Sequence, residues 1–223
     1  MIKGHVITIM DLPQSVAAAE RCIASAAKYG LPDVQMSPAT TPKHKPYELM
    51  EKLGLPIQDF KLDVGSRPDN VISAFLSHFR LWDQCRKGKD NFVIFEHDAV
   101  VIDNLPLYTP FDGCMSIGAP SYGKWQQPSM LGRNPLTSKP YFPGAHAYML
   151  NPRGAEKLCE AAQSYAMATD VFLQLSIFPW LEEYFPWPVV AKDSFTTIQN
   201  KTGSTAKHNY KKHPTTYEFI PVE

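Results

Sequence analysis

The chain has 223 residues, of which 44% are hydrophobic and 12% aromatic, so it can build one good-sized core and we expect a single domain over 1–223. Lys plus Arg (22) balances Asp plus Glu (22), which argues against an overall attraction to nucleic acid or anionic lipid. We expect neither a signal peptide nor a membrane span, since no apolar stretch approaches the roughly 18 residues that a span requires. The four cysteines lie far apart without a CxxC pair, so we expect buried, reduced thiols and a cytoplasmic location.

The first part of the chain predicts a strand, a helix and a second strand. A β-branched apolar run at 5–10 is typical of a buried strand, and the alanine-rich segment 14–29 has apolar positions at helical spacing. Residues 34–36 predict the second strand. The stretch 37–70 is rich in Pro and Lys, so we expect an excursion at one edge of the sheet with at most one short helix, near 47–53.

A long amphipathic helix comes next. Asp69 or Asn70 can cap this helix, which runs to about Arg86 and is closed by Gly88. Its apolar positions, three and four residues apart along one face, predict core side chains: Ile72, Phe75, Leu76, Phe79 and Trp82. A short apolar strand follows at 92–95.

The second half of the chain continues the alternation. Its predicted elements are a strand at 114–117, a loop at 119–143, a strand at 144–150, a helix at 152–162, a helical or extended piece at 171–177 and a last strand at 189–190. The remainder, about 192–223, is polar and predicts a basic tail. Short apolar strands that alternate with amphipathic helices predict an α/β fold with a mixed, mostly parallel central sheet and helices on both faces.

Three ionisable residues, Glu96, His97 and Asp98, directly follow the apolar run 92–95. Ligands bind at the carboxyl ends of the strands in such sheets, because side chains there point into the crevice between loops. Two carboxylates two residues apart point the same way along an extended backbone. Glu96 and Asp98 could therefore hold one divalent cation, or one cation and one sugar hydroxyl. A solvated turn is the alternative interpretation of this acid-x-acid triplet.

Two neighbouring segments resemble a known enzyme family. Ser73-Ala-Phe-Leu-Ser-His-Phe-Arg-Leu-Trp82, followed by Phe92-Val-Ile-Phe-Glu-His-Asp-Ala99, resembles the motif block of glycosyltransferase family 25, the lipopolysaccharide and collagen-type sugar transferases. Further similar segments follow in the family's order: Pro38-Ala39, Gly144-Ala-His-Ala-Tyr148, Arg153-Gly-Ala-Glu-Lys-Leu158 and Thr169-Asp170. The family's Glu-Asp-Asp stands here as Glu96-His97-Asp98, so the outer acids are kept and the central acid is replaced by a histidine.

The resemblance implies a GT-A-like, Rossmann-type domain that binds a nucleotide-sugar diphosphate, UDP-linked in our expectation, together with Mn²⁺ or Mg²⁺. It implies Asp98 as the first metal ligand and Glu96 as the second. Many metal-dependent transferases of this fold take another ligand from a late histidine, and His208 or His213 could serve here. The donor-binding candidates are Thr8, Met10, Asp11, Ala39, Ser77, His78, Glu96, His97 and Asp98. For His78 and His97, a structural role as a neutral core ring is the alternative.

Inverting transfer, which the resemblance also implies, needs a base that removes the proton of the acceptor hydroxyl. Asp170 is the carboxylate that matches the family, and an N-cap of the helix that begins at Val171 is its alternative role. His146 and Trp125 are the candidates for contacts with the acceptor.

The sequence leaves the acceptor open. A glycan such as lipopolysaccharide is one expectation. The basic tail and Trp125 would also suit an anionic acceptor such as phage DNA that carries hydroxymethylated bases. Two other classes remain possible, a sugar- or nucleotide-binding module that has lost catalysis and a metal-dependent phosphoesterase. A nicotinamide enzyme or a P-loop NTPase is disfavoured, because neither GxGxxG nor GxxxxGK followed by Ser or Thr occurs.

Overall fold

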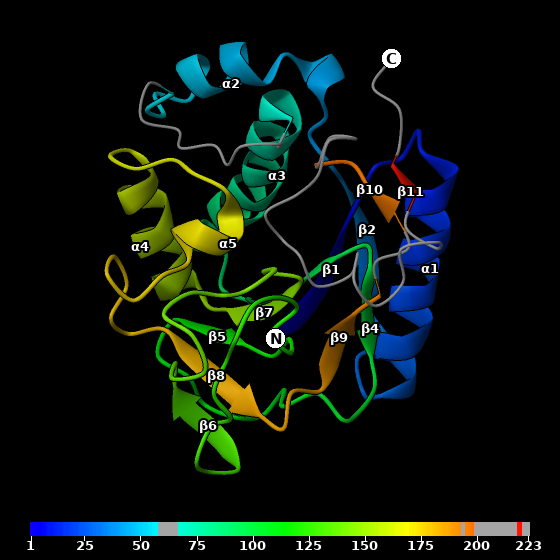
Figure 1. Ribbon diagram of the computed structural model, residues 1–223, viewed down its shortest axis with the longest axis vertical. Helices are drawn as coiled ribbons and strands as arrows, with labels where there is room; N and C mark the ends of the chain where they lie inside the picture. The colour runs from blue at the N-terminus through cyan, green and yellow to red at the C-terminus, as the bar shows by residue number, and fades with distance from the viewer. Residues whose placement is uncertain (58–66, 193–194, 199–217, 220–223) are drawn as a thin grey trace.

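A computed structural model describes residues 1–57, 67–192, 195–198 and 218–219 (Figure 1). A seven-stranded sheet forms the centre of the described residues. In sheet order its strands are β2 (Val34–Pro38), β1 (Ile2–Thr8), β3 (Asn91–Glu96), β7 (Ala147–Leu150), β5 (Cys114–Ser116), β8 (Glu182–Phe185) and β6 (Gly132–Pro135).

The strand directions make this sheet mixed. β2, β1, β3, β5 and β8 run the same way, whereas β7 and β6 run against their neighbours. The predicted mixed, mostly parallel sheet is therefore confirmed. Because parallel strands share their carboxyl ends, Thr8, Pro38 and Glu96 finish at the same edge of the sheet.

Each face of the sheet buries its own hydrophobic core, because successive side chains of a strand point to opposite faces. On β3, Ile94 belongs to one core and Val93 to the other. Figure 1 shows α1 (Pro13–Lys28) on one side of the sheet, with α3 (Pro68–Arg86), α4 (Pro152–Ala162) and α5 (Thr169–Phe172) on the other. Helices on both faces are thus confirmed.

The α3 side of the sheet holds the largest buried side chains. Trp82 packs on Phe172 of α5 with ring centroids 5.2 Å apart, and Phe75 meets both rings edge-on. Burial of each such side chain stabilises the fold by about 1.5–3 kcal/mol. This aromatic cluster fixes α5 against α3 beneath the carboxyl edge of the sheet.

Two small sheets flank the central one. β4 (Ala99–Val101) pairs antiparallel with β9 (Val189–Ala191), and β10 (Phe195–Thr196) pairs parallel with β11 (Glu218–Phe219). The chain passes from β3 into β4 through a turn at His97 and Asp98. The acid-x-acid triplet is therefore the junction between the central sheet and the β4–β9 sheet.

Several element predictions need correction. α3 begins at Pro68 with Arg67 as N-cap, and Asp69 lies in the first turn, so the predicted cap at Asp69 or Asn70 is wrong. The segment 119–143, predicted as loop, contains β6. This edge strand gains its backbone hydrogen bonds from β8, a pairing that the local Gly and Pro content hides.

Other details also differ from the expectation or complete it. The described part of the excursion 37–70 holds two short helices, η1 (Pro42–His44) and α2 (Pro46–Lys52), where at most one was expected. All four cysteines are free and buried, as predicted. Within the described parts of the chain, no helix is long and apolar enough to cross a membrane. Most of the predicted basic tail, including His208, lies outside the described residues.

Candidate active site

Glu96 ends β3 at the carboxyl edge of the sheet. Its backbone N–H donates to the carbonyl of His146, 2.9 Å away, which joins the end of β3 to the start of β7. The Glu96 side chain is 28% exposed and lies on the α3 side, where it meets His78 of α3. Glu96 therefore stands between the buried core and the solvent.

Asp98 lies beyond the strand, in the turn that leads to β4. Its backbone carbonyl accepts from the N–H of Lys192, 2.9 Å away. Burial, and secondarily the negative charge of Asp98, raise the pKa of the Cys22 thiol on α1 to about 12, so Asp98 lies near α1. Because His97 and Asp98 form a turn, the alternation of an extended strand does not govern the directions of Glu96 and Asp98.

His78 lies at the centre of a buried hydrogen-bonded group. Its Nε2 is 3.1 Å from Glu96 Oε1, and its Nδ1 is 2.8 Å from the hydroxyl of Tyr148 on β7. The Tyr148 hydroxyl also accepts from the indole N–H of Trp82, 2.7 Å away. Burial lowers the pKa of His78 to about 3, so its contact with Glu96 is a hydrogen bond of a neutral ring and not an ion pair.

Asp170 lies in the first turn of the short helix α5. The Tyr122 hydroxyl donates to its Oδ2, and the Val171 N–H donates to its Oδ1, 2.9 Å away. The N-cap of α5 is Ala168, so Asp170 is not the N-cap that its alternative role required. The charge of Asp170 acts on His78, where it opposes the effect of burial on the pKa. The carboxylate of the predicted base therefore lies close enough to His78 for its charge to act on the ring.

The Tyr122 side chain is held from several sides. Burial, with the negative charge of Asp170, raises its pKa far above the ordinary value, so it stays protonated and donates. The ammonium group of Lys139 lies 4.8 Å from the ring centres of Tyr122 and Tyr141, and it donates to the Tyr141 hydroxyl at 3.0 Å.

His146, a predicted acceptor contact, is only 2% exposed. Its ring packs against Gly118, where a Cβ would come within 2.5 Å of Nε2. Ala145, the preceding residue, has a left-handed backbone with φ 46°. The fold therefore buries the His146 side chain.

The loops after β1 and β2 are tied together at the same edge. The Ala39 N–H donates to the carbonyl of Thr8 at 2.8 Å, and the Thr40 N–H donates to the Ser77 hydroxyl at 2.8 Å. The loop after β1 is also held by an exposed ion pair of 2.9 Å between Asp11 and Lys43. These contacts bring four donor candidates to one edge: Thr8, Asp11, Ala39 and Ser77.

The remaining predicted residues lie further out. Met10 is 52% exposed, and Trp125 is 47% exposed with its ring edge-on to Trp187, the centroids 5.3 Å apart. His97 stacks almost parallel on Phe195, with centroids 5.1 Å apart and planes at 3°.

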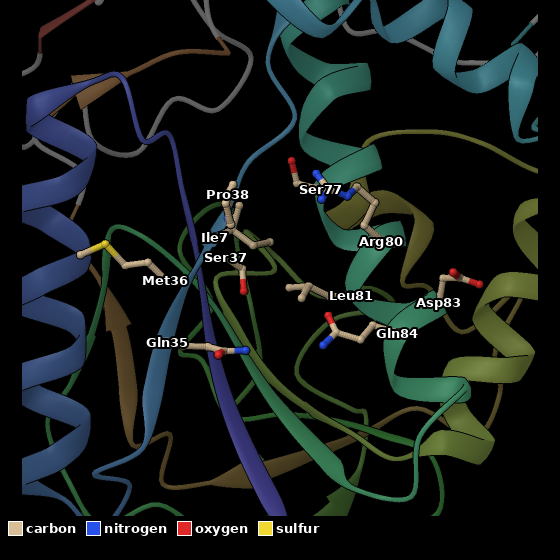
Figure 2. Close-up of a pocket in the computed structure, with 10 residues that line it drawn as sticks. All are labelled: Ile7, Gln35, Met36, Ser37, Pro38, Ser77, Arg80, Leu81, Asp83 and Gln84. Carbon is tan, nitrogen blue, oxygen red and sulfur yellow. The ribbon is translucent and has the colours of Figure 1, made fainter.

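A cavity of about 360 Å³ lies between the edge strand β2 and α3. Figure 2 shows Gln35 of β2 and Gln84 of α3 pointing toward each other across it, with Leu81 between them. Ser77 lines its upper end. Glu96, His97, Asp98 and Asp170 do not line this cavity.

In the part of the chain that the structure describes, no three His, Cys, Asp or Glu side chains form a cluster that could hold a metal ion. A site built wholly from protein ligands is therefore not seen there. Mg²⁺ is commonly held by one or two carboxylates together with substrate phosphates, and such a site needs fewer protein ligands.

Two residues of this site escaped the sequence reasoning. Tyr122 lies in a loop without periodicity, 48 residues from its partner Asp170, and no local signal points to it. Tyr148 belongs to a resembling segment, but its bridging position between Trp82 and His78 depends on the pairing of β7 with β3.

No protein-family model and no curated protein sequence matches the chain. Solved structures match with low similarity, among them two proteins of Streptococcus pneumoniae. A glycosyltransferase of Streptococcus pneumoniae TIGR4, GlyE, matches with a TM-score of 0.40 and 10% identity over 82% of this chain and 45% of that one. The CTP:phosphocholine cytidylyltransferase LicC of Streptococcus pneumoniae matches with a TM-score of 0.42 and 11% identity over 86% of this chain and 93% of that one. The chain thus spans less than half of the glycosyltransferase, and similarity at this level carries no functional argument.

Proposed function

We propose that this chain is a glycosyltransferase that moves a sugar from a nucleotide-diphosphate donor, UDP-linked, to a hydroxyl acceptor with inversion. The observation that carries the proposal is the position of Glu96. It ends a buried strand at the carboxyl edge of the sheet and is hydrogen-bonded to His78, a ring on which the charge of Asp170 also acts. The same Glu and His belong to the two segments that resemble glycosyltransferase family 25.

Donor binding would use the edge where β1, β2 and β3 end. Thr8, Ala39 and Ser77 are joined there by backbone and hydroxyl hydrogen bonds, which gives the donor a rigid floor. Asp98 and Glu96 would hold Mn²⁺ or Mg²⁺, which when bound supplies positive charge beside the departing diphosphate. His208, the third candidate ligand, lies outside the described residues.

Asp170 would accept the proton of the acceptor hydroxyl. A general base must be oriented toward the proton that it removes. The Tyr122 hydroxyl donates to one carboxylate oxygen of Asp170 and the Val171 N–H donates to the other, which orients the carboxylate. The exposed ring of Trp125 would offer a stacking surface to an acceptor, for which a glycan is our first choice and a hydroxymethylated DNA base the second.

The test is a panel of nucleotide sugars, with and without Mn²⁺, scored by thermal shift and by release of nucleoside diphosphate. A ligand that binds only the folded state raises the melting temperature, and about 2.7 kcal/mol of stabilisation is expected at a hundredfold excess over Kd. We expect a UDP-sugar to give a metal-dependent shift and slow metal-dependent hydrolysis.

Variants separate the competing classes. Asp98→Asn should abolish turnover and the metal-dependent part of binding, while Asp33→Asn, at an exposed surface carboxylate, should change neither. Binding without turnover on any acceptor would favour a binding module. Release of phosphate from simple phosphoesters would instead favour a phosphoesterase, and full activity of Asp98→Asn would refute the proposed site.

A further inference from the structure

The hydrogen bonds beneath Glu96 form one continuous network, which runs from the buried core to the carboxyl edge of the sheet. Trp82, Tyr148 and His78 are each at most 1% exposed, whereas the Glu96 side chain is 28% exposed. Solvent therefore reaches this hydrogen-bond network only at Glu96. Every donor in the buried part must find its acceptor within the protein.

The donor and acceptor capacity of each group determines the direction of every hydrogen bond in this network. The Trp82 indole can only donate, so the Tyr148 oxygen accepts from it. The Tyr148 hydroxyl proton then has one acceptor within reach, His78 Nδ1 at 2.8 Å. With Nδ1 accepting, the imidazole proton lies on Nε2 and points to Glu96 Oε1 at 3.1 Å. Each buried donor then has a partner.

Every other protonation state of His78 leaves a buried donor without an acceptor. If Nδ1 carried a proton, in the other neutral tautomer or in the imidazolium, it would donate to the Tyr148 oxygen. The Tyr148 hydroxyl proton would then have no acceptor among its described contacts. A protonated Glu96 that donates to Nε2 fails for the same reason, since it would force the proton onto Nδ1.

We propose that Tyr148 is a positioning residue that holds His78 as the Nε2–H tautomer and thereby fixes the Glu96 carboxylate at the carboxyl edge of the sheet. A neutral donor orients a carboxylate without cancelling its charge, whereas an imidazolium would oppose a bound cation. The effect on donor and metal binding rests on the proposed function, but the tautomer does not.

The tautomer is measured directly by long-range ¹H–¹⁵N correlation spectra of the histidine side chains at neutral pH, which distinguish a protonated from an unprotonated ring nitrogen. The His78→Gln variant assigns the His78 signals among the seven histidines. We expect a protonated Nε2 and an unprotonated Nδ1 in the wild-type protein. A protonated Nδ1 there would overturn the inference, whatever the enzyme's activity.

The positioning role is tested with Tyr148→Phe, which removes the hydroxyl that donates to His78. We expect a mixture of tautomers and a loss of Mn²⁺-dependent UDP affinity of roughly 10–100-fold, the usual effect of an outer-shell partner. Trp82→Phe keeps the Tyr148–His78 bond and should keep the tautomer. Tyr29→Phe is the matched control, because it removes a tyrosine hydroxyl on the α1 side that takes no part in this hydrogen-bond network.

A second pair of variants keeps the test decisive if Tyr148→Phe does not fold. His78→Gln retains an N–H donor toward Glu96, and His78→Leu does not, so Gln should keep more UDP and Mn²⁺ affinity than Leu. Equal affinities in this pair, or a folded Tyr148→Phe with unchanged affinity, would overturn the positioning role alone. If wild-type protein binds no nucleotide or metal, the proposed function fails while the tautomer assignment stands on its spectrum.

Discussion

Tyr122, from the loop after β5, donates its hydroxyl to the carboxylate of Asp170 on α5. The bond joins the predicted base to a segment 48 residues away in the chain. It also brings the Lys139 ammonium near the base, since Lys139 lies over the Tyr122 ring. The orientation of Asp170 therefore depends on the loop as well as on its own helix.

Removal of the Tyr122 hydroxyl should affect both stability and turnover. Tyr122→Phe loses a hydrogen bond to a charged group, and we expect the free energy of unfolding to fall by about 1.5–3 kcal/mol. With Asp170 less well oriented, kcat should fall more than the donor KM changes. Urea denaturation and steady-state kinetics measure the two effects, and Tyr108→Phe, at a 99% exposed tyrosine, is the control. A Tyr122→Phe protein with wild-type kcat would separate Asp170 from catalysis.

The contact between Gly118 and His146 predicts a size limit at position 118. An added Cβ would lie 2.5 Å from His146 Nε2, so Gly118→Ala should lower the free energy of unfolding by about 1–3 kcal/mol. Gly88→Ala is the matched control, because its nearest contact would be an ordinary 3.5 Å. The double variant Gly118→Ala, His146→Ala should recover part of the loss. Additive losses in the double variant would contradict the proposed clash.

We expect His5 to lower the free energy of unfolding in mild acid. Its ring is fully buried in β1, and burial, with the positive charge of Lys3, lowers its pKa from 6.5 to about 4. Between these values the unfolded chain binds a proton that the folded protein does not, so stability falls as the pH is lowered from about 6.5 to about 4. The contribution of His5 is at most about 3 kcal/mol.

The effect of His5 is isolated by comparison with a variant. Urea denaturation at several pH values should give a smaller acid-side slope for His5→Gln than for the wild-type protein. The two hydrogen-bonding neighbours of His5, Ser37 at 3.0 Å and Gln35 at 3.1 Å, remain in both proteins. Identical slopes would mean that folding does not lower the pKa of His5.

Glu183 is a carboxylate with a structural role outside the candidate site. It is fully buried, and its Oε1 accepts from the backbone N–H groups of Thr137 at 2.6 Å and Ser138 at 2.7 Å. Its Oε2 accepts from the indole of Trp187 at 3.3 Å. Glu183→Gln sets an amide N–H₂ against one of these donors, so we expect a loss of about 1.5–3 kcal/mol in unfolding free energy. Glu51→Gln, at an exposed position, is the control and should be neutral within experimental error.

The sequence predicted well the elements whose pattern is local. The helix at 152–162 agrees with α4, and the helix at 14–29 differs from α1 by one residue at each end, because apolar spacing and flanking Pro or Gly mark such helices. β6 was missed because its residues, Gly-Arg-Asn-Pro, have no strand pattern and depend on pairing with β8. The cap of α3 was misassigned because Pro68, at the first helical position, moved the start of the helix ahead of Asp69.

The candidate site divides in the same way. The resemblance named Glu96 and His78 as donor-binding candidates, and their contact of 3.1 Å follows from the packing of α3 on β3. The directions of Glu96 and Asp98 could not be predicted, since they depend on a turn that begins immediately after the strand. Tyr122 could not be predicted at all, because only the folded loop brings it to Asp170.

The four buried cysteines offer a way to watch the molecule open. Burial raises the pKa of Cys22, Cys85 and Cys159 to about 12, and thiol reagents attack the thiolate, so the folded protein should react very slowly. Cys22 lies on the α1 side of the sheet, whereas Cys85 and Cys159 lie on the α3 side. Labelling rates at these positions would report separately on the opening of the two layers, and ligand-dependent protection would reveal which layer a donor stabilises.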